Sequence, residues 1–293
     1  MVSKIRQYWE NKDHHYHSEA YKFADGAPRY PLYEIRLDRV GEILQNVTPG
    51  KALDAGCGKG ILVRTLLENG WDAQGCDFSQ VMVEAARTTL SDGDFKAERI
   101  EHYSVDDLSA YESVVYDLVT CFGVLDYVRP NQGAEAKTFA EFRRLVKPDG
   151  IVIVDNVNRL FDLFTFNKFT VAFYNEFFLA EIFGDTAERE EILEHINKLI
   201  TNPDQPVAKE KYGTDRDRVS QIADNPMTFA AKVEQYGFKE VDRAYIRFHA
   251  VPPILFKDNP ELEQRAIDIE KTLCRDWRGA FMSSLFLSVL RPE

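Results

Sequence analysis

Residues 51–60 are KALDAGCGKG, and this stretch decides the fold. KALDA is a short apolar run of the kind that forms a buried strand, and the glycines after it allow a tight turn and a close approach to a ligand. A helix is expected to begin at residue 60, and its N-terminus would present unpaired N–H groups and a positive dipole end. The alternative interpretation is a tight turn that binds nothing.

The spacing of the glycines narrows the choice of ligand. A dinucleotide fingerprint needs G-x-G-x-x-G, but position 61 is Ile and the third glycine comes early, at Gly60. The chain also lacks G-x-x-x-x-G-K-[ST], so a P-loop is not supported. The pattern therefore disfavours a nicotinamide oxidoreductase and a P-loop nucleotidase.

Strands and helices alternate outward from this turn. Strands are expected at 51–55, 71–77, 114–121, 151–155, 238–248 and 284–291, and helices at 31–44, 60–69, 79–90, 134–146, 186–200 and 227–236. Near-continuous apolar strands between helices are typical of an α/β fold with a mostly parallel sheet covered on both faces. Lys147-Pro148-Asp149-Gly150 is expected to be a turn, and Gly237 to end the last of these helices.

Three regions differ in character. We expect an N-terminal helical lid at 1–45, a core at 46–156 and 226–293, and a helical insertion at 157–225. The insertion carries phenylalanines at the spacing of one helix face: Phe166, Phe169, Phe173 and Phe177. This stripe has three interpretations, namely the packed face of a helix, a lid over a substrate, or a contact between two copies of the chain.

Composition limits the class of protein. The 293 residues are 44% hydrophobic and 29% charged, which is typical of a folded globular chain. The net charge of −12 argues against a general binder of nucleic-acid backbones. We find no apolar run of about 18 residues and no apolar leader, and the four cysteines form no CxxC pair. We therefore expect a cytoplasmic protein with reduced thiols, no membrane contact and no nucleic-acid partner.

Asp77 is the second chemical signal. It ends the next expected strand, 19 residues after Gly58, where a carboxylate can accept hydrogen bonds from both hydroxyls of a ribose. Phe78 and Met82 follow and could cover a purine face. The alternative for Asp77 alone is a helix cap.

Together these stretches resemble the class I S-adenosylmethionine-dependent methyltransferases. The resemblance rests on LDAGCGKG (53–60), CDFSQVMVEAAR (76–87), YDLVTCFGVLDYV (116–128) and FRRLVKPDGIVIVDNVN (142–158). It covers roughly residues 45–160, and a weaker similarity continues through MTFAAKVEQYGFKEV and SLFLSVL. It implies a Rossmann-like seven-stranded sheet with an antiparallel last strand. It also implies S-adenosyl-L-methionine as donor and S-adenosyl-L-homocysteine as product.

The resemblance assigns roles along the chain. Asp54 and the glycines would face the methionine half of the cofactor, Asp77 the ribose, and residues 102–108 the adenine. Many relatives carry an acid where this chain has Ser104-Val105, so we take Asp106 as the candidate for the adenine amino group. The expected cofactor-binding residues are Asp54, Gly56, Cys57, Gly58, Gly60, Asp77, Phe78, Ser79, Met82, Ser104, Val105, Asp106, Cys121 and Phe122.

Two alternatives concern the fourth and fifth strands. Some relatives bind a divalent cation through an Asp-Asn pair and a further acid, but Phe122 stands where that acid would be. We therefore expect no metal, with Asp155 and Asn156 as polar residues of the strand-end crevice. Cys121 is expected to be a core thiol rather than a nucleophile.

The acceptor is expected to be an oxygen or nitrogen atom of a small molecule, such as a sugar, a polysaccharide precursor or a secondary metabolite. His249 is the candidate catalytic base, with His14, His15 and His17 as alternatives. The competing hypotheses are a protein or nucleic-acid methyltransferase and a cofactor-binding regulator without catalysis.

Overall fold

The computed structural model describes residues 32–161, 174–180, 184–200, 222–248 and 260–293. The chain divides into two compact units. The core unit comprises 1–157, 215–244 and 286–293, and the second unit comprises 158–214 and 245–285. In the part of the chain that the structure describes, no helix has both the length and the apolar character needed to cross a membrane.

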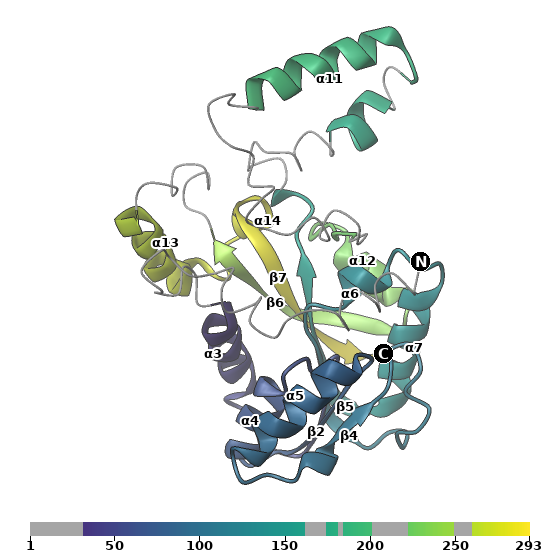
Figure 1. The fold of residues 1–293 in the computed structure, drawn as a ribbon, viewed down its shortest axis with the longest axis vertical. Coiled ribbons are helices and arrows are strands. Elements are labelled where there is room, and N and C mark those ends of the chain that lie inside the picture. The colour runs from purple at the N-terminus through teal and green to yellow at the C-terminus, as the bar shows by residue number, and fades with distance from the viewer. Residues whose placement is uncertain (1–31, 162–173, 181–183, 201–221, 249–259) are drawn as a thin grey trace. The chain divides into compact units, whose positions relative to one another are not determined.

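One seven-stranded sheet organises the fold (Figure 1). Its strands are β1 (Lys51–Ala55), β2 (Asp72–Asp77), β3 (Ile100–His102), β4 (Tyr116–Cys121), β5 (Val146–Val157), β6 (Phe238–Phe248) and β7 (Ser283–Pro292), in the order β3-β2-β1-β4-β5-β7-β6. β1 pairs in parallel with β2 and β4, β2 with β3, and β4 with β5, whereas β7 is antiparallel. The expected Rossmann-like architecture is confirmed.

The helices also follow the sequence pattern. The core unit holds α3 (Leu32–Leu44), α4 (Ile61–Glu68), α5 (Gln80–Ser91), the 3-10 turn η1 (Ala97–Arg99), α6 (Leu125–Val128), α7 (Ala134–Leu145) and α12 (Phe229–Glu234). α4 and α5 pack against β1, β2 and β3, and α7 packs against β4 and β5 (Figure 1). The short α6 was not expected. α12 ends at Glu234, earlier than expected, and Gly237 follows with a φ of 78°.

The expected turn at 147–150 is wrong. These residues lie inside β5, where Tyr116 pairs with Val146 and Leu118 pairs with Ile151, so four residues bulge opposite the single Asp117. The Asp117 carboxylate accepts hydrogen bonds from Lys147 Nζ at 2.8 Å and from Lys51 N at 2.8 Å. The sequence Lys-Pro-Asp-Gly by itself predicts a turn. In the folded chain, the contacts made by Asp117 stabilise this segment as a bulge inside β5.

The second unit contains α11 (Ala187–Ile200), the π-helix η2 (Tyr174–Leu179), α13 (Pro260–Leu273) and α14 (Gly279–Met282). The buried carboxylate of Glu270 on α13 accepts hydrogen bonds from the backbone N–H groups of Arg247, at 2.8 Å, and Phe248, at 3.3 Å. Arg247 has a φ of 58°, in the left-handed region that residues other than glycine seldom adopt. Glu270 therefore fixes the backbone where β6 ends.

A closed ring of four alternating charges joins α12 to the rest of the core unit. Arg129 contacts Glu135 at 2.7 Å and Asp224 at 3.0 Å, and Lys232 contacts the same two carboxylates at 2.7 Å each. The Arg129 side chain is only 4% exposed. Asp224 N also donates to the carbonyl of Val157 at 2.9 Å. The ring therefore fixes the segment before α12 beside the end of β5.

Breaking this ring should destabilise the protein much more than breaking an exposed ion pair. In Arg129→Met the partner carboxylates lose a buried cation, which costs roughly 3–5 kcal/mol of unfolding free energy. The matched control is Arg64→Met, which breaks the exposed Arg64–Glu68 pair at 2.8 Å on α4 and should cost less than about 1 kcal/mol. Urea unfolding of both variants is the measurement, and equal losses would show that the ring adds nothing beyond a surface pair.

Candidate functional site

The glycine turn after β1 is docked onto the end of β2. The N–H groups of Gly56 and Cys57 both donate to the carbonyl of Cys76, at 2.8 and 2.9 Å. Gly56 has a φ of 83°, and a Cβ built there would lie 2.4 Å from Val124 Cγ2. Only glycine allows the turn to lie this close to the loop after β4.

The other two glycines of the turn have different surroundings. A Cβ on Gly58, whose φ is 50°, would meet nothing within 4 Å. A Cβ on Gly60 would lie 2.9 Å from Ala86 Cβ and 3.3 Å from Leu90 Cδ1, because α4 begins against α5. Gly60 therefore serves helix packing, whereas Gly58 faces the open space that a ligand at this turn would need.

Asp77 links the turn to β2. Its carboxylate accepts hydrogen bonds from Gly58 N at 3.0 Å and from Ser79 N at 2.9 Å, and the residue is buried. Burial raises the pKa of this carboxyl, and the two N–H donors oppose that shift. The N-cap of α5 is Ser79, whose side chain accepts a hydrogen bond from Met82 N, so the helix-cap alternative for Asp77 is wrong.

Asp54 lies at the end of β1 with its side chain turned toward β4. Thr120 Oγ1 donates to Asp54 Oδ1 at 2.7 Å, and Asp54 is 4% exposed. Burial is the main reason that the pKa of Asp54 rises to about 7, and the Thr120 hydrogen bond opposes the shift. Sequence reasoning missed Thr120, although the parallel register of β1 and β4 places Thr120 opposite Asp54.

The segment expected to hold an adenine follows β3. His102 Nε2 lies 2.7 Å from the carbonyl oxygen of Phe78, which ties this segment to the end of β2. Ser104 Oγ donates to the Asp106 carboxylate. Phe78 and Asp106 are partly exposed, whereas Val105 and Met82 are buried. Of the two side chains expected at a purine face, Phe78 is therefore the accessible one.

The thiols near the site are buried and free of disulfides. Burial raises the pKa of the Cys121 thiol well above its ordinary value, and it does the same for Cys57. A thiol that does not ionise near neutral pH is a poor nucleophile. This environment supports the interpretation of Cys121 as a core thiol.

Asp155 and Asn156 are held by arginines. Asp155 accepts hydrogen bonds from Arg36 Nη2 at 2.6 Å and from Gly123 N at 2.6 Å, and the Asn156 side-chain oxygen accepts one from Arg129. A divalent cation here would have to compete with two guanidinium groups, and Phe122 offers no oxygen ligand. Asp155 and Asn156 are both buried, and among the described residues no group of three or more His, Cys, Asp or Glu side chains is placed to hold a metal ion.

Arg36 was missed by the sequence analysis. It lies on α3, outside every motif, yet its guanidinium carbon sits 5.4 Å from the centre of the Phe122 ring while it pairs with Asp155. Nothing in the local pattern of LYEIRLDRVGEIL separates this arginine from Arg39 on the same helix.

Several predicted residues lie outside the described part of the chain. They are the candidate base His249, its alternatives His14, His15 and His17, and Phe166, Phe169 and Phe173 of the phenylalanine stripe. The backbone of Phe177 lies in η2, and its side chain is outside the description. Their roles stay predictions.

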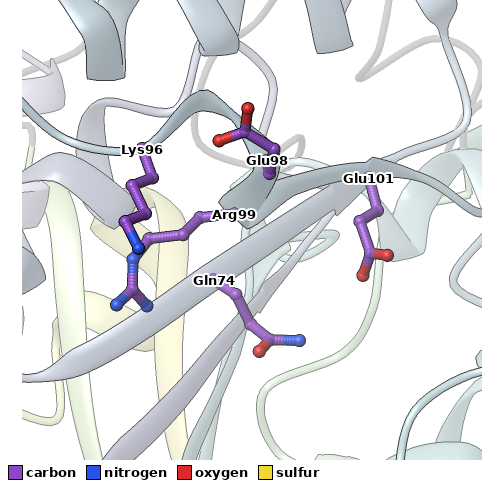
Figure 2. Close-up of a pocket in the computed structure, with 5 residues that line it drawn as sticks. All are labelled: Gln74, Lys96, Glu98, Arg99 and Glu101. Carbon is purple, nitrogen blue, oxygen red and sulfur yellow. The ribbon is translucent and has the colours of Figure 1, made fainter.

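A separate pocket lies beside β2 and β3 and is lined by Gln74, Lys96, Glu98, Arg99 and Glu101 (Figure 2). Arg99 pairs with Asp72 at 2.6 Å, at the opposite end of β2 from Asp77. The residues that line this pocket therefore include neither the glycine turn nor Asp77.

Comparison with known proteins identifies the region around the turn. Residues 53–152 match the family model described as "Methyltransferase domain". The chain is 31% identical over 159 residues to the ubiquinone biosynthesis O-methyltransferase of Aromatoleum aromaticum, covering 51% of this chain and 66% of that protein. The protein of the same name in Vibrio campbellii is 33% identical over 153 residues, covering 48% and 63%. The matches thus span less than two thirds of these relatives.

Solved structures share the fold at low sequence identity. A crystal structure of a Pyrococcus horikoshii protein aligns with a TM-score of 0.51 at 14% identity, covering 97% of this chain and all of that one. The magnesium protoporphyrin IX methyltransferase of Synechocystis aligns with a TM-score of 0.51 at 14% identity, covering 100% and 94%. These likenesses show the fold alone.

The raised pKa of Asp54 predicts a specific pH dependence of stability. Its carboxyl has an ordinary pKa of 3.8 and a pKa of about 7 in the folded chain, so folding favours the protonated form. The resulting stabilisation is fully present below pH 4 and is lost as the pH rises through 7. Asp54→Asn keeps an acceptor for Thr120 but cannot ionise. The free energy of unfolding of the wild type should therefore fall relative to this variant between pH 4 and pH 7, and parallel curves would contradict the assignment.

Proposed function

This chain belongs to the class I S-adenosylmethionine-dependent methyltransferases, and we propose that it transfers the methyl group of S-adenosyl-L-methionine to an oxygen atom of a small molecule. The observation that best supports this proposal is the glycine turn of 56–60. It is fixed to the end of β2 by Asp77 and lies inside the matched methyltransferase domain. The choice of oxygen is supported by the O-methyltransferase relatives.

The turn and its acids suit the cofactor of this family. The open space beside Gly58 leaves room for the donor, and the carboxyl groups of Asp54 and Asp77 flank the turn. Asp54, with its raised pKa, would ionise next to the positive charge of the methionine portion. A carboxylate has about four acceptor positions. At Asp77, Gly58 N and Ser79 N occupy two of them, which leaves capacity for the ribose hydroxyls.

The adenine would lie beside the segment after β3. We assign Phe78, which is partly exposed, to the face of the ring, and Asp106, oriented by Ser104, to its amino group. Val105 is buried and contributes through its backbone. Ser79 and Met82 would contribute by fixing the start of α5, because the side chain of Ser79, the N-cap, accepts a hydrogen bond from Met82 N.

When bound, S-adenosyl-L-methionine supplies an activated methyl group on a sulfonium, so the protein must mainly align the acceptor and exclude water. Phe122, directly after β4, would line that part of the crevice, and the fully buried Cys121 would support it from the core. For an alcohol acceptor a base removes the proton from oxygen, and we propose His249 for this role.

The parts of the chain outside the motifs are our candidates for binding the acceptor. We propose that residues 1–45 act as a lid and that 157–225 recognise the acceptor. The hydrogen bond from Asp224 N to the Val157 carbonyl supports this because it brings both ends of that insertion to the end of β5, where ligands bind in open α/β sheets. We also propose a cytoplasmic location, and we leave the homodimer as a hypothesis for the phenylalanine stripe.

The function is tested by donor binding and by methyl transfer. Calorimetry should detect binding of S-adenosyl-L-methionine and S-adenosyl-L-homocysteine but not of NAD. Labelled methyl groups should pass to hydroxylated small molecules in a panel, and transfer should survive EDTA because Asp155 and Asn156 are held by arginines. NAD binding without binding of either methionine nucleoside would overturn the proposal, and loss of transfer on chelation, restored by magnesium, would overturn the metal-free part.

Asp77→Asn should weaken binding of S-adenosyl-L-homocysteine by about ten- to hundredfold, because charge-assisted hydrogen bonds contribute roughly 1.5–3 kcal/mol. Asparagine preserves the shape and one acceptor oxygen for Gly58 or Ser79, so the turn has a partner. Asp72→Asn, at the other end of β2, is the matched control and should bind like the wild type. An unchanged dissociation constant in folded Asp77→Asn would reject the ribose assignment.

A further inference from the structure

Thr120 is a polar residue in a fully buried part of the sheet. It lies on β4, where it pairs with Asp54 on β1 and with Ile153 on β5, so its backbone is fixed from both sides. Its neighbours Val119 and Cys121 are, like Thr120 itself, fully buried. A valine has nearly the same shape without a polar group, and burying a hydroxyl costs free energy unless it is hydrogen-bonded. Packing alone therefore does not call for a threonine at this position.

The hydroxyl serves the acid on the neighbouring strand. Thr120 Oγ1 donates to Asp54 Oδ1 at 2.7 Å, and Asp54 is 4% exposed. Asp54 lies two residues before Gly56, the first glycine of the turn. The hydrogen bond from Thr120 therefore orients the carboxylate that stands directly before the proposed donor site.

The surroundings of Asp54 disfavour its ionised form. Burial has the largest effect and raises the pKa of Asp54 to about 7, and the carboxylates of Asp77 on β2 and Asp155 on β5 act in the same direction. Two groups oppose the rise in the pKa: the hydrogen bond from Thr120, which has the larger effect, and the guanidinium of Arg36 on α3. The Thr120 hydroxyl is therefore the strongest local support for a negative charge on Asp54.

A negative charge on Asp54 matters to the proposed donor. The methionine half of S-adenosyl-L-methionine carries an ammonium, a sulfonium and one carboxylate, and so a net positive charge. Opposite charges attract across several ångströms without direct contact, most strongly where water is excluded. The thiols of Cys57, Cys76 and Cys121 also lie near Asp54, but their raised pKa values keep them neutral near pH 7.

We propose that Thr120 is a positioning residue for the donor site: its hydroxyl orients the Asp54 carboxylate and holds it in the ionised form that attracts the positively charged methionine half. Thr120 is fully buried and acts through Asp54. The inference rests on the proposed function and adds to the donor site a residue that the sequence analysis did not single out. It also makes donor binding depend on pH near neutrality.

The test is calorimetric binding of S-adenosyl-L-methionine between pH 6 and pH 8.5. In the wild type the affinity should rise across this range, because Asp54 ionises around pH 7. Thr120→Val removes the hydrogen-bond donor, and the rise should move upward by about one pH unit. The variant should then bind about tenfold more weakly than the wild type at pH 6, about fivefold more weakly at pH 7 and within about twofold at pH 8.5.

Two controls separate this role from a general loss of packing. Thr120→Ser keeps the hydroxyl and should keep the wild-type pH profile. Thr138→Val is the matched control, because Thr138 is also fully buried and its hydroxyl donates to the carbonyl of Ala134 at 2.9 Å within α7. It should keep the wild-type profile, and a shift equal to that of Thr120→Val would overturn the inference.

A double variant tests whether Thr120 acts through Asp54. Asp54→Asn cannot ionise, so it should bind the donor weakly and with a flatter pH profile. Adding Thr120→Val to it should change the affinity by less than about twofold at any pH, because the two residues act as one unit. An additive loss would overturn the inference. If Thr120→Val does not fold, Thr120→Ala removes the same hydroxyl and should show the same shift.

Three further results would overturn the inference: a wild-type affinity that does not change with pH, an unshifted profile without the hydroxyl, or a loss of affinity that is equal at every pH. Donor binding by the wild type separates the two levels of the argument. If the wild type binds neither S-adenosyl-L-methionine nor S-adenosyl-L-homocysteine, the proposed function itself fails. If it binds them but Thr120→Val keeps the wild-type profile, only the role of Thr120 fails.

Discussion

The docking of the glycine turn onto the end of β2 is the contact on which the proposed site depends. The Cys76 carbonyl accepts two successive N–H groups of the turn, and the next side chain, Asp77, accepts a third from Gly58. Three backbone N–H groups of the turn, which would otherwise need other partners, are thus satisfied by the end of a neighbouring strand. The same bonds keep one side of the turn open beside Gly58 and place the Asp77 carboxylate next to that opening.

The arrangement of the parallel strands brings several buried acids together, which is electrostatically unfavourable. Their carboxyl ends come together, and in this chain the acids Asp54, Asp77 and Asp155 come with them. Burial raises the pKa of Asp54 and of Asp77, which shows how unfavourable several buried negative charges are. Asp155 pairs with Arg36, a residue from outside the sheet. A positively charged donor fits the remaining excess of acid.

The two arginines at the end of β5 have different surroundings. Arg129 belongs to a ring of buried charges that fixes the segment returning before α12, and it holds the Asn156 side chain. Arg36 is more exposed and lies against an aromatic ring. Adjacent residues of a strand point to opposite faces. Asp155 therefore pairs with Arg36 on one face of β5, whereas Asn156 accepts a hydrogen bond from Arg129 on the other.

The sequence by itself determined the alternation of strands and helices and the residues of the turn, because apolar periodicity and glycine spacing are local properties, but it missed the short β3 and did not set the order of the strands. It placed β1 and β6 at their observed bounds and singled out Asp77. It misjudged residues 147–150, since the Asp117 contacts that make them a bulge come from β4 and β1. Only the tertiary structure brought Arg36 to Asp155 and Thr120 to Asp54, across 119 and 66 residues. Such pairs depend on how the helix and strands pack, and no local pattern encodes that.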